Sequence, residues 1–127
     1  IGWTLGSLHL GPPRSWSTFA LGQFWLFLWA LMQQYALQAI VNRRMQQFMG
    51  RGSASILAVA LVFAVLHLPN LWLTVATLAG GILWAAVYQR APNLYALALS
   101  HSLMTTVLAS SISPAVLHGL RVGYNYF

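Results

Sequence analysis

Apolar residues fall into four runs along the chain, separated by short stretches rich in glycine, proline, asparagine or arginine. The runs cover about residues 17–48, 53–69, 71–90 and 94–111. A continuous helix over the first run would be about 48 Å long. Because this exceeds a ~30 Å hydrocarbon core, we expect the helix to tilt or to project into the headgroups.

The second run is short for a membrane span. Only about fifteen residues precede Pro69, which cannot extend a helix and restricts the residue before it. We therefore expect this helix either to span a thinned region or to stop inside the protein beside a polar cavity.

The four runs predict an all-α polytopic membrane protein, with about four transmembrane helices and a short C-terminal interfacial helix. Residues 17–112 would form the helical core, and residues 1–16 and 113–127 would be interfacial segments that hold His9 and His118. Because the chain begins with Ile1 rather than methionine, we expect it to be a fragment or to lack its natural termini.

Composition supports the membrane class and makes the lipid bilayer the first partner. Hydrophobic residues make up 59% of the chain, charged residues only 5%, and the mean hydropathy is +0.70. All charges are arginines, with no aspartate or glutamate, so the arginines must face water, lipid phosphate or the acids of other membrane protein subunits. The arginines are scattered and form no basic–aromatic surface pattern, so no nucleic acid partner is expected. Cysteine is absent, which excludes disulfides and thiolate metal sites.

The positions of the arginines predict an orientation. Arg43, Arg44 and Arg51 flank the first connection and Arg90 the third, whereas the other two connections carry none. By the positive-inside rule the first and third connections should be cytoplasmic. We expect an integral protein of the bacterial cytoplasmic (inner) membrane.

Amide side chains recur along the first run. Gln34, Gln38, Asn42 and Gln46 are spaced four residues apart, which places them on one face of a helix, and Gln33 lies beside this stripe. Polar groups in hydrocarbon are costly, so the stripe predicts a hydrogen-bonded seam between helices, the water-exposed end of a long helix, or a functional site.

Two histidines lie inside the apolar runs. His67 follows Phe63 by four residues, and His101 precedes Thr105 by four. Each imidazole could bind a metal, shuttle a proton or ligate a pigment, although a single buried histidine is more often a hydrogen-bonded core residue. Two histidines together with an amide stripe favour a site.

Three stretches in this order resemble a known family. They are "QQYALQAIVNRRM" (33–45), "FAVLH" (63–67) and "HSLMT" (101–105). The pattern is similar to the EExxxR, FxxxH and HxxxN motifs of the CPBP group of intramembrane metalloproteases. That group includes CAAX prenyl endopeptidases of the Rce1 type and bacteriocin-processing or immunity proteins. The resemblance covers about residues 20–110 and implies a polytopic helical fold in which a glutamate, assisted by the histidines and the asparagine, activates water.

The chain departs from this pattern at the residues that carry the chemistry. Amides replace the glutamate pair and the arginine, and a threonine replaces the asparagine; the positions are Gln33, Gln34, Gln38 and Thr105. An amide cannot take a proton from water near neutral pH, and the chain has no carboxylate side chain elsewhere that could act as the base instead. The acids and the arginine are lost together, whereas loss of the acids alone would have left a buried unpaired arginine.

The sequence therefore favours a catalytically degenerate CPBP-like membrane protein that serves as a scaffold or accessory subunit of a larger complex and is not an enzyme. One alternative is an active protease in which His67 and His101 hold a metal, zinc by family resemblance, or polarise water directly. Hydrolytic zinc sites usually have three protein ligands and a base. Two further alternatives are ligation of a chlorin or haem by either histidine, and binding of a lipid or peptide in the former protease cavity.

Overall fold

Helices make up nearly all of residues 15–126, the part of the chain that this computed structural model describes. The first long helix comprises α2 (Trp16–Gln34), the π-helix η1 (Tyr35–Asn42) and α3 (Arg43–Met49). It is followed by α4 (Ser53–Val65), α5 (Leu71–Arg90), α6 (Leu94–Ser111) and α7 (Pro114–Leu117), and then by the 3-10 turns η2 (His118–Leu120) and η3 (Gly123–Tyr126). No strand occurs in this part of the chain, so the predicted all-α class is confirmed. His9 and most of the predicted interfacial segment of residues 1–16 lie outside the described residues.

The ends of the helices follow from local chemistry. The side chains of Ser15, Asn70 and Asn93 accept hydrogen bonds from the first-turn amides of α2, α5 and α6, at 3.5, 3.2 and 3.1 Å. At the end of α3, Gly50 and Gly52 take φ values of +76° and +131°, which side-chain-bearing residues rarely adopt, so the chain turns there into α4.

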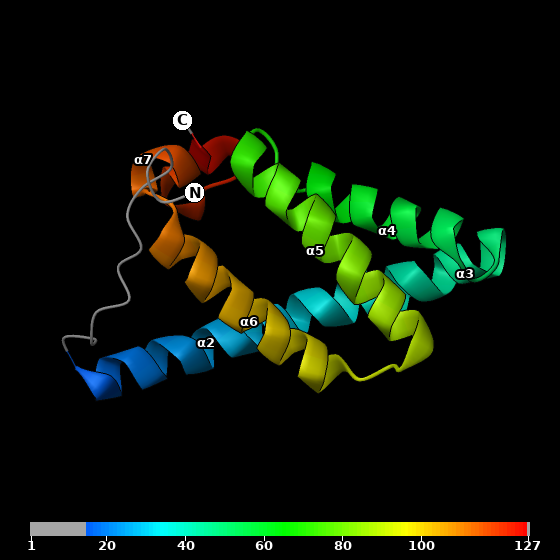
Figure 1. Cartoon of the computed structure of the whole chain (residues 1–127), viewed down its shortest axis with the longest axis horizontal. Coiled ribbons are helices and arrows are strands. Elements are labelled where there is room, and N and C mark those ends of the chain that lie inside the picture. Colours follow the sequence, from blue (N-terminus) through cyan, green and yellow to red (C-terminus); the bar gives the residue numbers. More distant parts are fainter. Residues whose placement is uncertain (1–14, 127) are drawn as a thin grey trace.

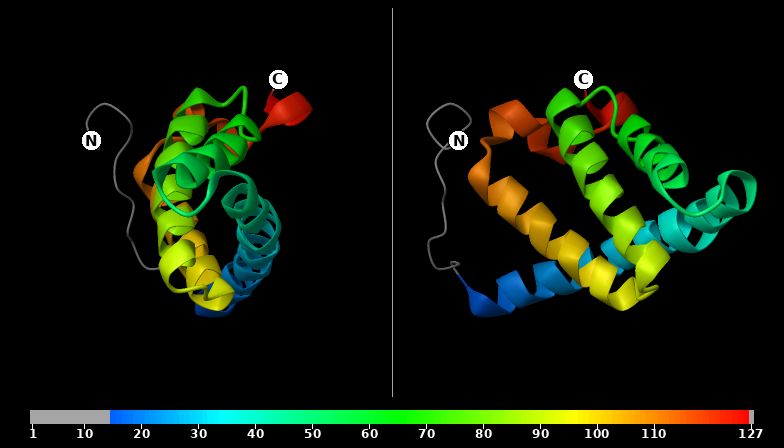
Figure 2. Two further views of the ribbon diagram at one scale, coloured as in Figure 1. Left: turned by 90° about the vertical axis from the view of Figure 1, so that its right-hand side faces the viewer. Right: turned by 45° about the vertical axis from the view of Figure 1, so that its right-hand side comes forward.

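The helices pack in two pairs, and the first long helix belongs to one pair and also contacts the other. α4 packs along α5, and α6 crosses α2 (Figure 1). The π-helical segment η1 contacts α4 and α5, so the long helix runs from one pair to the other, as the two further views in Figure 2 show. The apolar core lies around η1 and is formed by Leu37, Val59, Phe63, Trp84, Ala85, Tyr88 and Leu97.

The C-terminal segment does not form one continuous helix. His118, Gly119 and Leu120 have φ values of +49°, +60° and +62°, and these left-handed conformations end α7 after four residues. The segment docks on the turn between α4 and α5, where Asn70 Nδ2 donates to the carbonyl oxygens of Leu117 (2.6 Å) and Arg121 (3.2 Å).

Two helices of the described chain are long and apolar enough to cross a membrane, namely Trp16–Met49 and Leu71–Arg90. α4 is apolar but has only 13 residues, in agreement with the prediction that Pro69 cuts this helix short. The expected count of four spans therefore requires that α4 and α6 also cross the membrane.

Gly81 sets how closely α4 and α5 approach each other. A Cβ atom at this position would lie 3.0 Å from the Cα of Ala60, which is backbone and cannot move aside on its own. Small residues allow this kind of close packing between membrane helices.

We predict that Gly81→Ala lowers the free energy of unfolding in detergent by about 1–3 kcal/mol, because the added methyl group forces α4 and α5 apart. Gly22→Ala is the matched control, since a Cβ there meets nothing within 4 Å in helix α2. Equal stabilities of the two variants would show that the α4–α5 contact does not depend on Gly81.

Candidate functional site

A cavity of about 260 Å³ lies between α2, α5 and α6. Its wall is mostly apolar, with Trp29 from α2, Leu73 from α5 and Met104 from α6 among its members. The C-terminal segment contributes Leu120 and Val122, so the docked tail forms part of the wall.

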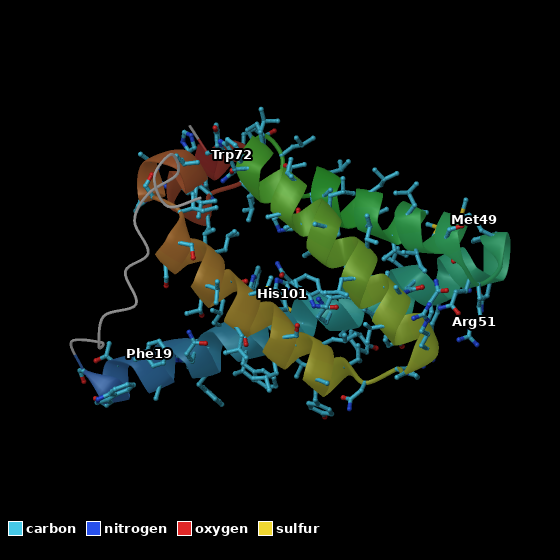
Figure 3. All side chains as sticks on the ribbon, viewed as in Figure 1. Phe19, Met49, Arg51, Trp72 and His101 are labelled. Carbon is cyan, nitrogen blue, oxygen red and sulfur yellow. The ribbon has the colours of Figure 1, made fainter. Side chains whose placement is uncertain are left out.

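The structure brings the residues predicted from the three motifs to this one region. Four of them line the cavity: Gln33, His67, His101 and Thr105. Gln34 and Gln38 are fully buried and belong to the hydrogen-bonded amide stripe. Figure 3 shows His101 near the centre of the molecule, on the helix that crosses α2.

The amide stripe is a continuous ladder of hydrogen bonds along the first long helix. Gln38 Nε2 donates to Gln34 Oε1 (3.2 Å), Asn42 Nδ2 to Gln38 Oε1 (2.7 Å) and Gln46 Nε2 to Asn42 Oδ1 (3.0 Å). At its inner end Gln34 Nε2 contacts Nδ1 of His101 at 3.2 Å. The prediction of a hydrogen-bonded seam is therefore confirmed.

The ladder also ties α4 and α5 to the first helix. Gln89 Nε2 donates to Asn42 Oδ1 (3.0 Å) and to Ser55 Oγ (2.9 Å), while its Oε1 accepts from the backbone amide of Gly52 (3.0 Å). Among the described residues, no buried side-chain nitrogen or oxygen lacks a partner. Gln89 and Ser55 were not predicted as members, because they lie on α5 and α4 and no local spacing in the sequence links them to the stripe.

The direction of the ladder follows from one backbone group. Asn42 Nδ2 donates to the carbonyl oxygen of Ala85 at 3.3 Å, and a carbonyl oxygen can only accept. Nδ2 of Asn42 must therefore face Ala85, and the same nitrogen donates to Gln38 Oε1. Each amide from Asn42 to Gln34 consequently points its nitrogen towards His101. Nδ1 of His101 then accepts, so its imidazole is neutral and carries its proton on Nε2.

His67 is in the opposite tautomer. Its Nδ1 lies 2.7 Å from the carbonyl oxygen of Phe63, to which it must donate, so in the neutral imidazole the lone pair is on Nε2. The two histidines share an aromatic cluster. The ring centroid of Phe63 is 4.7 Å from that of His67 and 5.7 Å from that of His101, and Trp84 lies 4.5 Å from His101 at an interplanar angle of 30°.

The donor set of this cavity does not fit a hydrolytic zinc ion. His67 offers one lone pair, whereas both nitrogens of His101 are engaged, one as the acceptor for Gln34 and the other by its own proton. Within residues 15–126 there is no group of three histidine, cysteine, aspartate or glutamate residues that could hold a metal. His118 lies elsewhere, with its Nε2 3.0 Å from the hydroxyl of Tyr126 in the C-terminal segment.

An imidazolium in this cavity wall would be a cation with no acidic side chain in the chain to pair with, so the neutral form of its polar groups is favoured. The hydroxyl of Thr105 donates to the backbone carbonyl of His101 (3.0 Å), and the Gln33 amide has no hydrogen-bond partner among the described residues. Gln33 and the Nε2–H of His101 can donate hydrogen bonds to a ligand, and Nε2 of His67 can accept one, but none of these groups equals a carboxylate as a base for activating water.

Comparison with known proteins identifies a family. A family model described as type II CAAX prenyl endopeptidase Rce1-like matches residues 15–107, a range that includes all three motif stretches. No curated protein and no solved structure matches the chain significantly.

We predict that ¹⁵N NMR of histidine-labelled protein will show His101 with an unprotonated Nδ1 and a protonated Nε2, because the ladder presents an amide donor to Nδ1. Gln34→Leu removes that donor and should let the His101 tautomers mix. Gln33→Leu is the control, since Gln33 makes no bond to the ladder, and it should leave the His101 signals unchanged. A protonated Nδ1 in the unmodified chain would show that the ladder runs in the other direction.

Proposed function

This chain belongs to the Rce1-like family of type II CAAX prenyl endopeptidases, and from that premise we propose that it is a non-catalytic member. In this proposal it serves as a scaffold or accessory subunit of a larger membrane protein complex. The observation that carries the proposal is the neutral amide ladder that ends on His101.

The ladder supports the loss of catalysis because Gln34 and Gln38 occupy two of the three positions at which the family pattern has its charges. Activation of water needs a group that can accept a proton, and the amides of Gln33 and Gln34 cannot do so. The bond from Gln34 also holds His101 in the tautomer without a lone pair on Nε2. Only His67 Nε2 is left as a base, with no carboxylate side chain in the chain to assist it.

The environment of Gln38 supports a coordinated change rather than a single lost residue. Gln38 is fully buried, and its amide is satisfied on both sides by Gln34 and Asn42. An arginine at this position would be a buried cation with no acidic side chain in the chain to pair with, which is costly inside a membrane. The retained fold with a neutral interior suits a structural role.

Two features support a role among other membrane subunits. Large aromatic side chains are exposed along α2, including Trp16 (71%), Trp25 (61%) and Trp29 (56%), and these can face lipid or neighbouring helices. The arginines find no acidic side chain within the chain and can pair with acids of a partner. The cavity, with Trp29 in its wall, offers a place for a lipid or for a peptide segment of that partner.

We further propose four crossings of a bacterial inner membrane, with the arginine-bearing connections in the cytoplasm. α6 has 18 residues and would extend about 27 Å, close to the thickness of the hydrocarbon core. Arg43, Arg51 and Arg90 lie around one pocket at the same end of the molecule, as a one-sided distribution requires.

We predict that the purified chain does not cleave a prenylated CAAX peptide, and that the triple variant Gln33→Glu, Gln34→Glu, Gln38→Arg gains at least about 100-fold over this background. A carboxylate at position 34 would accept a hydrogen bond from Nδ1–H of His101, which favours the tautomer with the proton on Nδ1 and the lone pair on Nε2. The control is the same variant with His67→Ala, which should be inactive. Cleavage by the unmodified chain that disappears in His67→Ala would establish the active protease instead.

We predict that the chain copurifies with other membrane proteins in fixed ratio when it is extracted from its native membrane in mild detergent. Native mass spectrometry of the extract measures the ratio. Migration as a single monomer, with no copurifying protein, would contradict the role as a subunit while leaving the loss of catalysis untouched.

A further inference from the structure

A second pocket, of about 280 Å³, lies at the end of the molecule where the first long helix and α5 both end. Arg43 and Gln46 line it from α3, Arg51 from the connection to α4, and Tyr88 and Arg90 from α5. Figure 3 shows Arg51 at this end, near Met49. The pocket is separate from the histidine cavity and shares no lining residue with it.

Two of the three arginines are held in place by buried neighbours. The Arg51 guanidinium donates to the backbone carbonyl of Gln89, and Arg43 Nε donates to the hydroxyl of Tyr88 at 3.2 Å. Tyr88 and Gln89 are only 5% and 7% exposed, so they are rigid anchors. Because a guanidinium has five N–H donors, each arginine keeps donors for a ligand.

The charge of this pocket is not balanced within the chain. Three of the six arginines of the chain line it, and no aspartate or glutamate exists anywhere in the sequence. Carbonyl groups at the C-terminal end of α5 favour nearby cations, but they carry only a partial negative charge. The three like charges repel one another, so an anion in the pocket would stabilise the fold.

We propose that this pocket binds a phosphate group, supplied by the headgroup of an anionic phospholipid. Arginine matches phosphate oxygens with two parallel hydrogen bonds, and a set of arginines suits this anion better than a single point charge. The lipid is favoured as the source because Phe48 (83% exposed) and Met49 (54% exposed) end the same helix that carries Arg43 and present apolar surface to a membrane at this level. A free phosphate ion is the other source of the same chemistry.

Arg90→Gln is the sharpest test, because the Arg90 side chain makes no hydrogen bond within the described residues that the substitution would break. The matched control is Arg44→Gln. Arg44 lies on the same helix as Arg43 and loses the same charge, but it donates to Gln47 on the helix surface and does not line the pocket. Arg90→Lys, which keeps the charge and loses the planar guanidinium, is the second variant.

The unfolding midpoint of the full chain in neutral detergent is measured against added phosphatidylglycerol, phosphatidylcholine or inorganic phosphate. Phosphatidylglycerol should raise the midpoint of the unmodified chain and of Arg44→Gln. The apparent affinity should be about fivefold weaker in Arg90→Gln, since one cationic side chain near an anionic headgroup is lost. The apparent affinity of Arg90→Lys should lie between those of the unmodified chain and Arg90→Gln. If Arg90→Gln does not fold, Arg90→Lys still tests whether the Arg90 guanidinium binds the headgroup.

Protection by inorganic phosphate equal to that by phosphatidylglycerol would support the phosphate site and assign it to a soluble ligand. Equal losses of affinity in Arg44→Gln and Arg90→Gln would overturn the proposal, because diffuse attraction to the whole basic surface would then explain the binding. Absence of any shift in the unmodified chain with all three additives would also overturn it.

Discussion

The structure depends on one constraint, which is that amide side chains placed in an apolar interior must all find hydrogen-bond partners. Gln34, Gln38 and Asn42 are fully buried, and they satisfy one another along the first long helix. The hydrogen-bonding groups of Asn42 and Gln34 that are not used within the ladder bind to neighbouring helices. Asn42 bonds to Ala85 and Gln89 of α5, and Gln34 bonds to His101 of α6. The hydrogen bonds that remove polar groups from the apolar medium thus also hold both helix pairs to the same segment.

The same ladder determines the chemistry of the cavity. Because each amide has a donor end and an acceptor end, a single carbonyl at Ala85 sets the direction of all of them and finally the tautomer of His101. His67, in the turn that follows α4, takes the other tautomer through the backbone carbonyl of Phe63. Residues 15–126 therefore contain two separate polar regions of different character. One is a neutral cavity between the helix pairs, and the other is a basic pocket at the end where the first helix and α5 both terminate.

Local patterns predicted the helices closely, and the reason is physical. Proline, glycine and the capping asparagines act within a few residues of their own position, so the ends of α4, α5 and α6 could be read from the sequence. The spacing of four between the amides predicted their shared face for the same reason. The C-terminal segment was predicted less well, since the left-handed conformations of His118 and Leu120 belong to its docking against Asn70 and leave no pattern in the sequence.

The sequence by itself determined the helical class, the absence of any carboxylate side chain, and the three motif positions that carry amides and histidines. These are properties of composition and of short-range spacing. Only the tertiary structure decided which polar groups meet. Gln89 bonds to Asn42 across 47 residues of chain and to Ser55 across 34, and His101 receives its bond from Gln34 across 67. No local pattern encodes such contacts, because they depend on how α4, α5 and α6 pack around the first helix. For the same reason the tautomers of the two histidines, and the gathering of Arg43, Arg51 and Arg90 around one pocket, are properties of the folded chain.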